Sequence, residues 1–248
     1  MPGSSTGKEM TRSSRAFYLS LIIGLAAVKT CEATSLQVSP VTIDIPPSGA
    51  SAVVTLRNSG AKPLSAQIRV FKWTQADGED VLEPTESVVA SPPSIDLTGD
   101  QTYSVRIVRT DETPVTQSEY YRLLVDELPD SATPRPGTVN MVMRYSIPVF
   151  FEQADGEPPK LSWSYKKSKG SVALTLRNDG DQHIKISNLT LKNSAGATVG
   201  FGAGLVGYAL AHSQVVWTRA SKGFSGGPSK VTAQSDMGPI NGEAVEQR

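Results

Sequence analysis

Two stretches of the chain, Val54–Gly60 and Leu174–Gly180, carry almost the same sequence, Val-Thr-Leu-Arg-Asn-Ser-Gly and Leu-Thr-Leu-Arg-Asn-Asp-Gly. In each stretch apolar and polar residues alternate before the asparagine, and a second alternating stretch follows the glycine. A period of two is typical of half-buried strands, and the Asn-containing tripeptide predicts a turn because Asn and Gly tolerate positive φ. A hairpin that recurs after 120 positions predicts two copies of one all-β domain.

The composition is that of an ordinary globular protein. The chain has 248 residues, of which 38% are hydrophobic and 19% are charged, enough for two mid-sized cores. The formal net charge is zero, and the basic residues are scattered. Because a nucleic-acid binder needs a basic surface, we expect no nucleic-acid partner.

The first 33 residues predict a secretory signal peptide that is cleaved after Ala33. Basic residues precede a short apolar run, 16–28, and small residues follow it, which is the pattern of such a peptide. The run is short for a membrane span, although an uncleaved anchor helix stays an alternative. Cleavage would also remove Cys31, the single cysteine. We therefore expect an exported protein without disulfides and without stable membrane insertion.

Strand-like runs at regular spacing predict an immunoglobulin-like β-sandwich over residues 34–152. A polar, proline-closed linker follows at 153–159, then a second β-sandwich domain at 160–235 and a flexible tail at 236–248. The expected strands are 36–45, 50–58, 65–73, 87–91, 103–109, 119–128 and 138–151 in the first domain, and 161–166, 171–178, 183–192, 197–201, 205–210, 214–218 and 229–234 in the second.

The last strand-like run of the first domain is long and strongly apolar, and it contains Pro148. A proline inside a strand indicates a sheet edge, because its missing N–H cannot join a ladder on that side. Soluble proteins normally avoid apolar edge strands, which promote aggregation. Two interpretations stay open: a core strand of the sandwich, or a strand kept apolar because a client pairs with it. The alternate residues on one side are Val139, Met141, Met143, Tyr145 and Ile147.

Several short motifs follow one another in a fixed order along the first domain. They are Val38–Thr42, the Leu-Arg-Asn turn, Ser91-Pro92-Pro93, Ser104–Ile107, Tyr121–Pro129 and the closing apolar run. In order and spacing these motifs resemble the periplasmic pilus, or fimbrial, assembly chaperones. The resemblance covers most of residues 36–234 and is best in the first domain.

The resemblance implies two immunoglobulin-like β-sandwich domains set at an angle around a cleft. It implies a periplasmic chaperone, not an enzyme, that binds pilin-like subunits and delivers them to an outer-membrane usher by donor-strand complementation. In this mechanism the side chains of Val139, Met141 and Met143 enter the subunit, with Tyr145 and Ile147 nearer the cleft. Each such apolar side chain contributes about 1.5–3 kcal/mol when buried. The resemblance implies no cofactor.

The sequence departs from the family at the residues that hold the client's C-terminal carboxylate. The family's arginine in the first strand corresponds here to Thr42, and its lysine in the last strand corresponds to Pro148. Candidate replacements are Arg106, Arg109 and Arg144, since a guanidinium binds a carboxylate through two hydrogen bonds. A structural role for Arg106 and a solvent-facing Arg144 stay alternatives. The departure indicates a divergent branch of the family, of the spore-coat-like or archaic type.

Two short motifs suggest enzymes but lack the required context. Gly223–Gly227 fits the Gly-x-Ser-x-Gly pattern, yet both histidines, His183 and His212, precede the serine, and no helical pattern follows it. Gly202–Gly207 fits a dinucleotide-binding pattern but lies among strands and turns. The isolated histidines predict no metal site.

Three functions therefore remain. The leading hypothesis is the chaperone, the alternative is an exported two-domain structural or adhesive protein, and the third is an exported all-β enzyme. Self-association of the free chaperone through its apolar edge also stays open.

Overall fold

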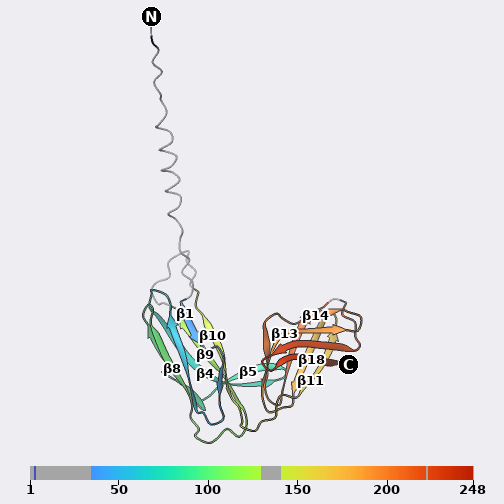
Figure 1. Ribbon diagram of the computed structural model, residues 1–248, viewed down its shortest axis with the longest axis horizontal. Helices are drawn as coiled ribbons and strands as arrows, with labels where there is room; N and C mark the ends of the chain where they lie inside the picture. Colours follow the sequence, from blue (N-terminus) through green and yellow to red (C-terminus); the bar gives the residue numbers. More distant parts are fainter. Residues whose placement is uncertain (1–2, 4–34, 130–140, 222, 248) are drawn as a thin grey trace. The chain divides into compact units, whose positions relative to one another are not determined.

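The computed structural model describes residues 3, 35–129, 141–221 and 223–247 (Figure 1). In this part of the chain all regular secondary structure is β-strand, which confirms the all-β prediction. No helix among the described residues is long and apolar enough to cross a membrane. The predicted signal peptide and Val139 lie outside the described residues.

The first domain is a sandwich of two sheets that enclose one apolar core (Figure 1). One sheet has the order β1-β3-β8-β6, and the other has the order β2-β10-β9-β4-β5, with β7 paired to β4. Alternate residues of each long strand point inward, as Leu56, Ile107 and Leu123 do at 0% exposure. The strands are β1 (Leu36–Ser39), β2 (Ile43–Ile45), β3 (Ser51–Asn58), β4 (Leu64–Ala76), β5 (Glu79–Pro84), β6 (Val88–Ser91), β7 (Ser94–Leu97), β8 (Thr102–Arg109), β9 (Glu119–Leu128) and β10 (Arg144–Phe151).

The second domain is an eight-stranded sheet around its own core, with the order β14-β13-β17-β18-β11-β12-β16 and β15 paired to β13. The flexible tail predicted at 236–248 is wrong for most of its length, because β18 pairs antiparallel with β17 and parallel with β11. The strands are β11 (Leu161–Ser168), β12 (Ser171–Asn178), β13 (Ile184–Asn193), β14 (Thr198–Gly200), β15 (Leu205–Ala209), β16 (Ser213–Ala220), β17 (Ser229–Ser235) and β18 (Gly238–Glu246).

The repeated Leu-Arg-Asn turn forms the same structure in both domains. Asn58 and Asn178 are fully buried, and each side-chain oxygen accepts a hydrogen bond of 3.0 Å from the glycine two residues later. Each amide nitrogen donates to carbonyl groups of two other segments. Neither asparagine has the positive φ that the sequence suggested. The turn depends instead on the side-chain amide, which satisfies buried backbone groups.

Several strand boundaries differ from the predictions. The run 36–45 forms two strands, β1 and β2, which join different sheets. The strands β5 and β7 were not predicted. The strand β5 is exposed and carries little apolar alternation, and β7 is only four residues long. In the last apolar run only β10 is a strand, and Met141–Met143 precede it without strand structure. The expected strand over 138–151 is therefore wrong at Met141–Met143 and confirmed at Arg144–Phe151, while its first residues lie outside the described part of the chain.

An aromatic cluster joins the two domains. His183 of the second domain stacks on Phe150 of the first with ring centroids 3.6 Å apart, and its Nδ1 hydrogen-bonds Glu152. Because the cluster is buried, it holds the two domains in contact through apolar area as well as through hydrogen bonds. The buried members are Trp73, Tyr120 and Phe150 from the first domain and Tyr208 and Leu210 from the second.

Candidate functional site

The strand β10 is paired on only one side along its first five residues, Arg144–Pro148. It pairs with β9 from Arg144 to Phe151, whereas β2 covers only Val149–Phe151 on the other side. Among the described residues, no strand pairs with the outer side of Arg144–Pro148. This part of β10 is therefore a sheet edge with backbone groups available for another strand.

The direction of those backbone groups follows from the hydrogen bonds to β9. The amide of Glu127 donates to the carbonyl of Met143 at 2.9 Å, so odd-numbered residues of β10 bond toward β9 and even-numbered residues face the open side. Pro148 is even-numbered, and its missing N–H would have faced the open side. The proline therefore removes no bond to β9, and its interpretation as an edge residue is confirmed.

The predicted subunit-binding side chains differ in accessibility. Met141 is 75% exposed, and Met143 is partly exposed. Tyr145 packs against the core of its own domain, and its hydroxyl donates to the Leu36 carbonyl at 2.6 Å. Ile147 is only 2% exposed and belongs to that core. The structure thus leaves the methionines free for a partner, whereas Ile147 already fills its own domain.

Arg109 is already engaged within the first domain. Its guanidinium donates to both carboxylate oxygens of Glu119, at 2.9 and 3.3 Å, and to the carbonyls of Asp111 and Thr113. Burial raises the pKa of Glu119, but the hydrogen bonds from Arg109 and Tyr121 outweigh it and hold that pKa below its ordinary value. Through these contacts Arg109 forms a structural ion pair with Glu119.

Arg144 is also paired, and Arg106 lies on the other sheet. The Arg144 guanidinium bonds the carboxylate of Asp126, which Arg69 contacts at 2.6 Å from the other side. Burial tends to raise the pKa of Asp126, but hydrogen bonds from the two arginines lower it below its ordinary value. Arg106 is exposed on β8, in the β1-β3-β8-β6 sheet. The three candidate arginines therefore do not converge on one site.

A fourth arginine, not selected from the sequence, lies next to the open edge of β10. Arg122 of β9 lies directly opposite Pro148 in the β10 ladder. Its guanidinium carbon is 3.7 Å from the ring centroid of Trp73 and 5.4 Å from that of Tyr208. Among the described residues, its ion-pair partner is the carboxylate of Asp80, at 3.7 Å. Burial lowers the pKa of Arg122, and Asp80 only partly offsets this effect.

Tyr208 of the second domain lies near both Arg122 and Thr42. Its phenol hydrogen-bonds the side chain of Thr42, and burial raises the pKa of Tyr208. Thr42 and Pro148, the two positions predicted from the sequence to replace the family's arginine and lysine, thus both lie close to Arg122 or to the ring of Tyr208 beside it. The sequence could not single out Arg122, because only the register of β9 against β10 places it opposite Pro148.

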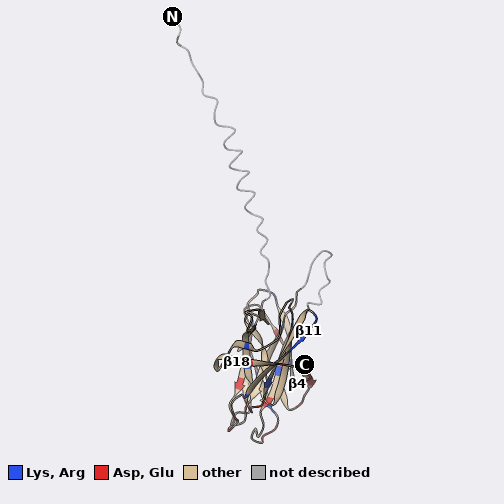
Figure 2. Ribbon diagram, turned by 90° about the vertical axis from the view of Figure 1, so that its right-hand side faces the viewer, with Lys and Arg blue, Asp and Glu red and all other residues tan. Residues whose placement is uncertain are grey.

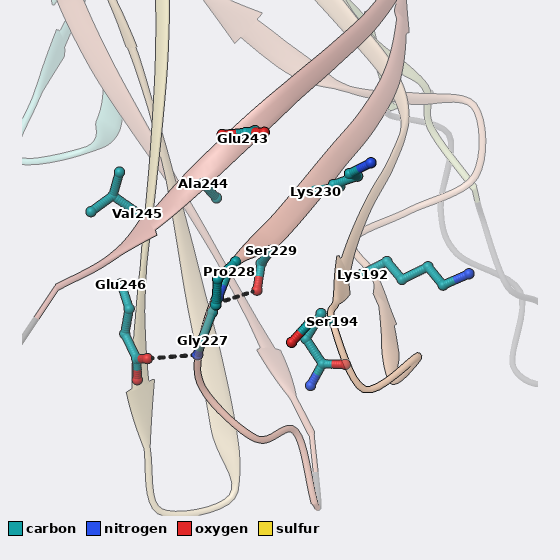
Figure 3. Close-up of a pocket in the computed structure, with 11 residues that line it drawn as sticks. Lys192, Ser194, Gly227, Pro228, Ser229, Lys230, Glu243, Ala244, Val245 and Glu246 are labelled. Atoms are coloured by element: carbon teal, nitrogen blue, oxygen red, sulfur yellow. Dashed lines mark hydrogen bonds between the residues drawn. The ribbon is translucent and has the colours of Figure 1, made fainter.

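A cavity of about 680 Å³ lies in the second domain at the ends of β13, β17 and β18. Figure 3 shows Lys192 and Lys230 extending to the same side of this groove. Glu246 accepts a hydrogen bond from the Gly227 amide at 2.9 Å and pairs with Lys167. The Ser229 hydroxyl in this groove donates to the Gly227 carbonyl at 3.0 Å.

Within the described part of the chain, neither the distribution of charge nor the placement of metal-ligating residues indicates a further site. In the view of Figure 2, basic and acidic residues lie interspersed among the strands, in keeping with the zero formal net charge. Among the described residues, no three His, Cys, Asp or Glu side chains gather as a metal site would require. Gly223–Gly227 lies outside regular structure between β16 and β17, and the Ser225 hydroxyl accepts a hydrogen bond from Asn193.

The comparison with known families agrees with this geometry. Residues 35–154 match the family described as pili and flagellar-assembly chaperone, PapD N-terminal domain. The first domain of the chain therefore belongs to this family of chaperones. Among curated proteins, none matches the chain.

Solved pilus chaperones share the fold of this chain. A chain of the CsuC–CsuE chaperone–tip adhesion subunit pre-assembly complex, from archaic Csu pili of Acinetobacter baumannii, is 25% identical with a TM-score of 0.67. The match covers 86% of this chain and 99% of that chain. The E. coli chaperone DraB is 19% identical, with a TM-score of 0.56 and coverage of 86% and 97%. The Salmonella enterica complex of SafA pilin with the SafB chaperone matches at 16% identity and a TM-score of 0.58, covering 85% and 96%.

Proposed function

We propose that this protein is a periplasmic chaperone that binds and stabilises pilus subunits and delivers them to an outer-membrane usher by donor-strand complementation. The open edge of β10 carries this proposal. A subunit that lacks a strand has unpaired backbone groups and an open apolar groove. The edge at Arg144–Pro148 supplies the backbone groups, and Met141 and Met143 supply exposed or partly exposed apolar side chains next to it.

The alternation of apolar residues before β10 predicts which side chains enter the subunit. Val139, Met141 and Met143 alternate along the chain before β10, and each would contribute about 1.5–3 kcal/mol when buried. Methionine suits a groove of irregular shape because its side chain is flexible. Tyr145 and Ile147 continue the alternation but pack in the core of the first domain, so they support the strand from behind.

We further propose that Arg122 binds the C-terminal carboxylate of the subunit. It is largely buried between aromatic rings, and Asp80 balances its charge only at 3.7 Å. A buried charge without a close partner is costly, and a carboxylate bound through two hydrogen bonds would relieve that cost. Arg109 and Arg144 already have close carboxylate partners, which makes them weaker candidates.

The test is capture of a subunit by the tagged mature protein in its native periplasm, with the captured proteins identified by mass spectrometry. The variant Met141→Glu with Met143→Glu should lose the subunit, because carboxylates cannot enter an apolar groove without a large desolvation cost. A matched control, Val53→Glu with Val89→Glu, adds the same charge at exposed apolar sites on the other sheet and should retain the subunit.

The expected result is a small pilin-like subunit held in equal amounts by the unchanged protein and by the control. If both double variants capture the same proteins, the edge mechanism is wrong. An exported two-domain structural or adhesive protein would then be the better interpretation.

A further inference from the structure

The hairpin formed by β4 and β5 extends from the first domain onto the second. Its turn contains Asp77 and Gly78, with φ of 53° and 84°. The carbonyl of Gly78 accepts a hydrogen bond of 2.9 Å from the amide of Val216 in β16. A Cβ atom at Gly78 would lie 2.5 Å from a methyl carbon of Val216. Only glycine therefore permits both this φ and this contact.

Gln75, three residues before the turn glycine, binds the second domain through its side-chain amide. Its nitrogen donates to the carbonyl of Tyr208 at 2.8 Å. Its oxygen accepts from the amide of Leu210 at 3.0 Å and from the hydroxyl of Ser213 at 2.7 Å. One side chain of the first domain thus satisfies three polar groups on the segment that contains Tyr208.

The same strand also carries the ring beneath the proposed anchor. Trp73 meets the ring of Tyr208 edge-on at a centroid distance of 5.6 Å, while Arg122 lies over the face of Trp73. Gln75 therefore holds the backbone of Tyr208 while Trp73 contacts its ring. The position of Tyr208 above Arg122 depends on both contacts from β4.

We propose that the β4–β5 hairpin is a positioning element that keeps Tyr208 over Arg122 and so keeps the guanidinium ready for a carboxylate. This inference rests on the proposed function, in which Arg122 binds the C-terminal carboxylate of the subunit. Without Tyr208 the guanidinium gains water, and its attraction for a carboxylate weakens because the local dielectric rises. Gln75 and Gly78 are positioning residues, since neither reaches the ligand.

The first measurement needs no ligand. Because the expected mature chain lacks cysteine, spin labels on Ser104→Cys and Lys192→Cys report the distance between the domains by pulsed electron resonance. Gln75→Ala should broaden the distance distribution. Gly78→Asn, which tolerates positive φ but inserts a side chain against Val216, should do the same. Gln67→Ala, an exposed glutamine on the same strand, should leave the distribution unchanged.

The second measurement separates positioning from general stability. The C-terminal peptide of the captured subunit is synthesised as the free acid and as the amide, and both affinities are measured for each protein. We expect Gln75→Ala to lower the affinity for the acid by roughly tenfold with little change for the amide. Gln67→Ala should match the unchanged protein for both peptides.

Two other results would overturn the inference in different ways. An unchanged acid-to-amide ratio in Gln75→Ala, with that ratio lost in Arg122→Gln, would refute the hairpin's role and leave the anchor intact. Equal affinities for acid and amide in the unchanged protein would refute the anchor itself.

Discussion

Replacing Asn58 with alanine is expected to destabilise the first domain by about 3 kcal/mol. The buried amide donates to the carbonyls of Lys62 at 2.7 Å and Thr98 at 3.0 Å, and it accepts from the amide of Gly60 at 3.0 Å. Each bond contributes about 1 kcal/mol net, and a buried partner left without a bond costs about 1–3 kcal/mol. A loss of this size is a large part of the stability of a small domain.

The assay is urea unfolding followed by tryptophan fluorescence. Trp73 is the single tryptophan of the first domain, and Trp163 and Trp217 report on the second. With a denaturant dependence of about 1–3 kcal/mol per molar urea, the Asn58→Ala midpoint should fall by about 1 M or more. Asn178→Ala should lower the transition of the second domain by a similar amount, since its hydrogen bonds are equivalent.

Asn241→Ala serves as the control, because this asparagine is exposed and should change stability by less than about 0.5 kcal/mol. A loss below about 1 kcal/mol in Asn58→Ala would refute the view that the amide closes the turn. A loss of stability that appears only in the unfolding transition of the second domain would refute this view as well.

Two further predictions separate structural from binding residues. Ile147→Ala should cost about 2–5 kcal/mol in urea unfolding, whereas Met141→Ala should change stability by less than about 0.5 kcal/mol; equal losses would contradict the assigned burial. Because the pKa of Asp126 is lowered in the folded state, its ion pairs stabilise the protein above about pH 4, and that contribution is lost as the pH falls through the folded pKa. The stability difference between the unchanged protein and Asp126→Asn should therefore shrink in acid, and a constant difference in thermal unfolding from pH 7 to pH 2.5 would exclude this role.

The sequence by itself predicted most of the strands and the repeated turn, and it indicated an edge position for Pro148. These features depend on neighbouring residues: alternation marks a half-buried strand, and a missing N–H limits a proline wherever its strand lies. The same local motifs in a fixed order also produced the resemblance to pilus chaperones. Local patterns failed at β18, whose residues alternate weakly and form a strand because β17 and β11 pair with it.

The candidate site was decided by tertiary structure. The sequence could not show that Ile147 fills the core of its own domain while Met141 stays exposed, because both continue one apolar alternation. Nor could it show that Arg109 is neutralised by Glu119, or that Arg122 lies opposite Pro148. Strand register and ion pairs join residues far apart in the chain, so the folded backbone sets which charged side chains are paired.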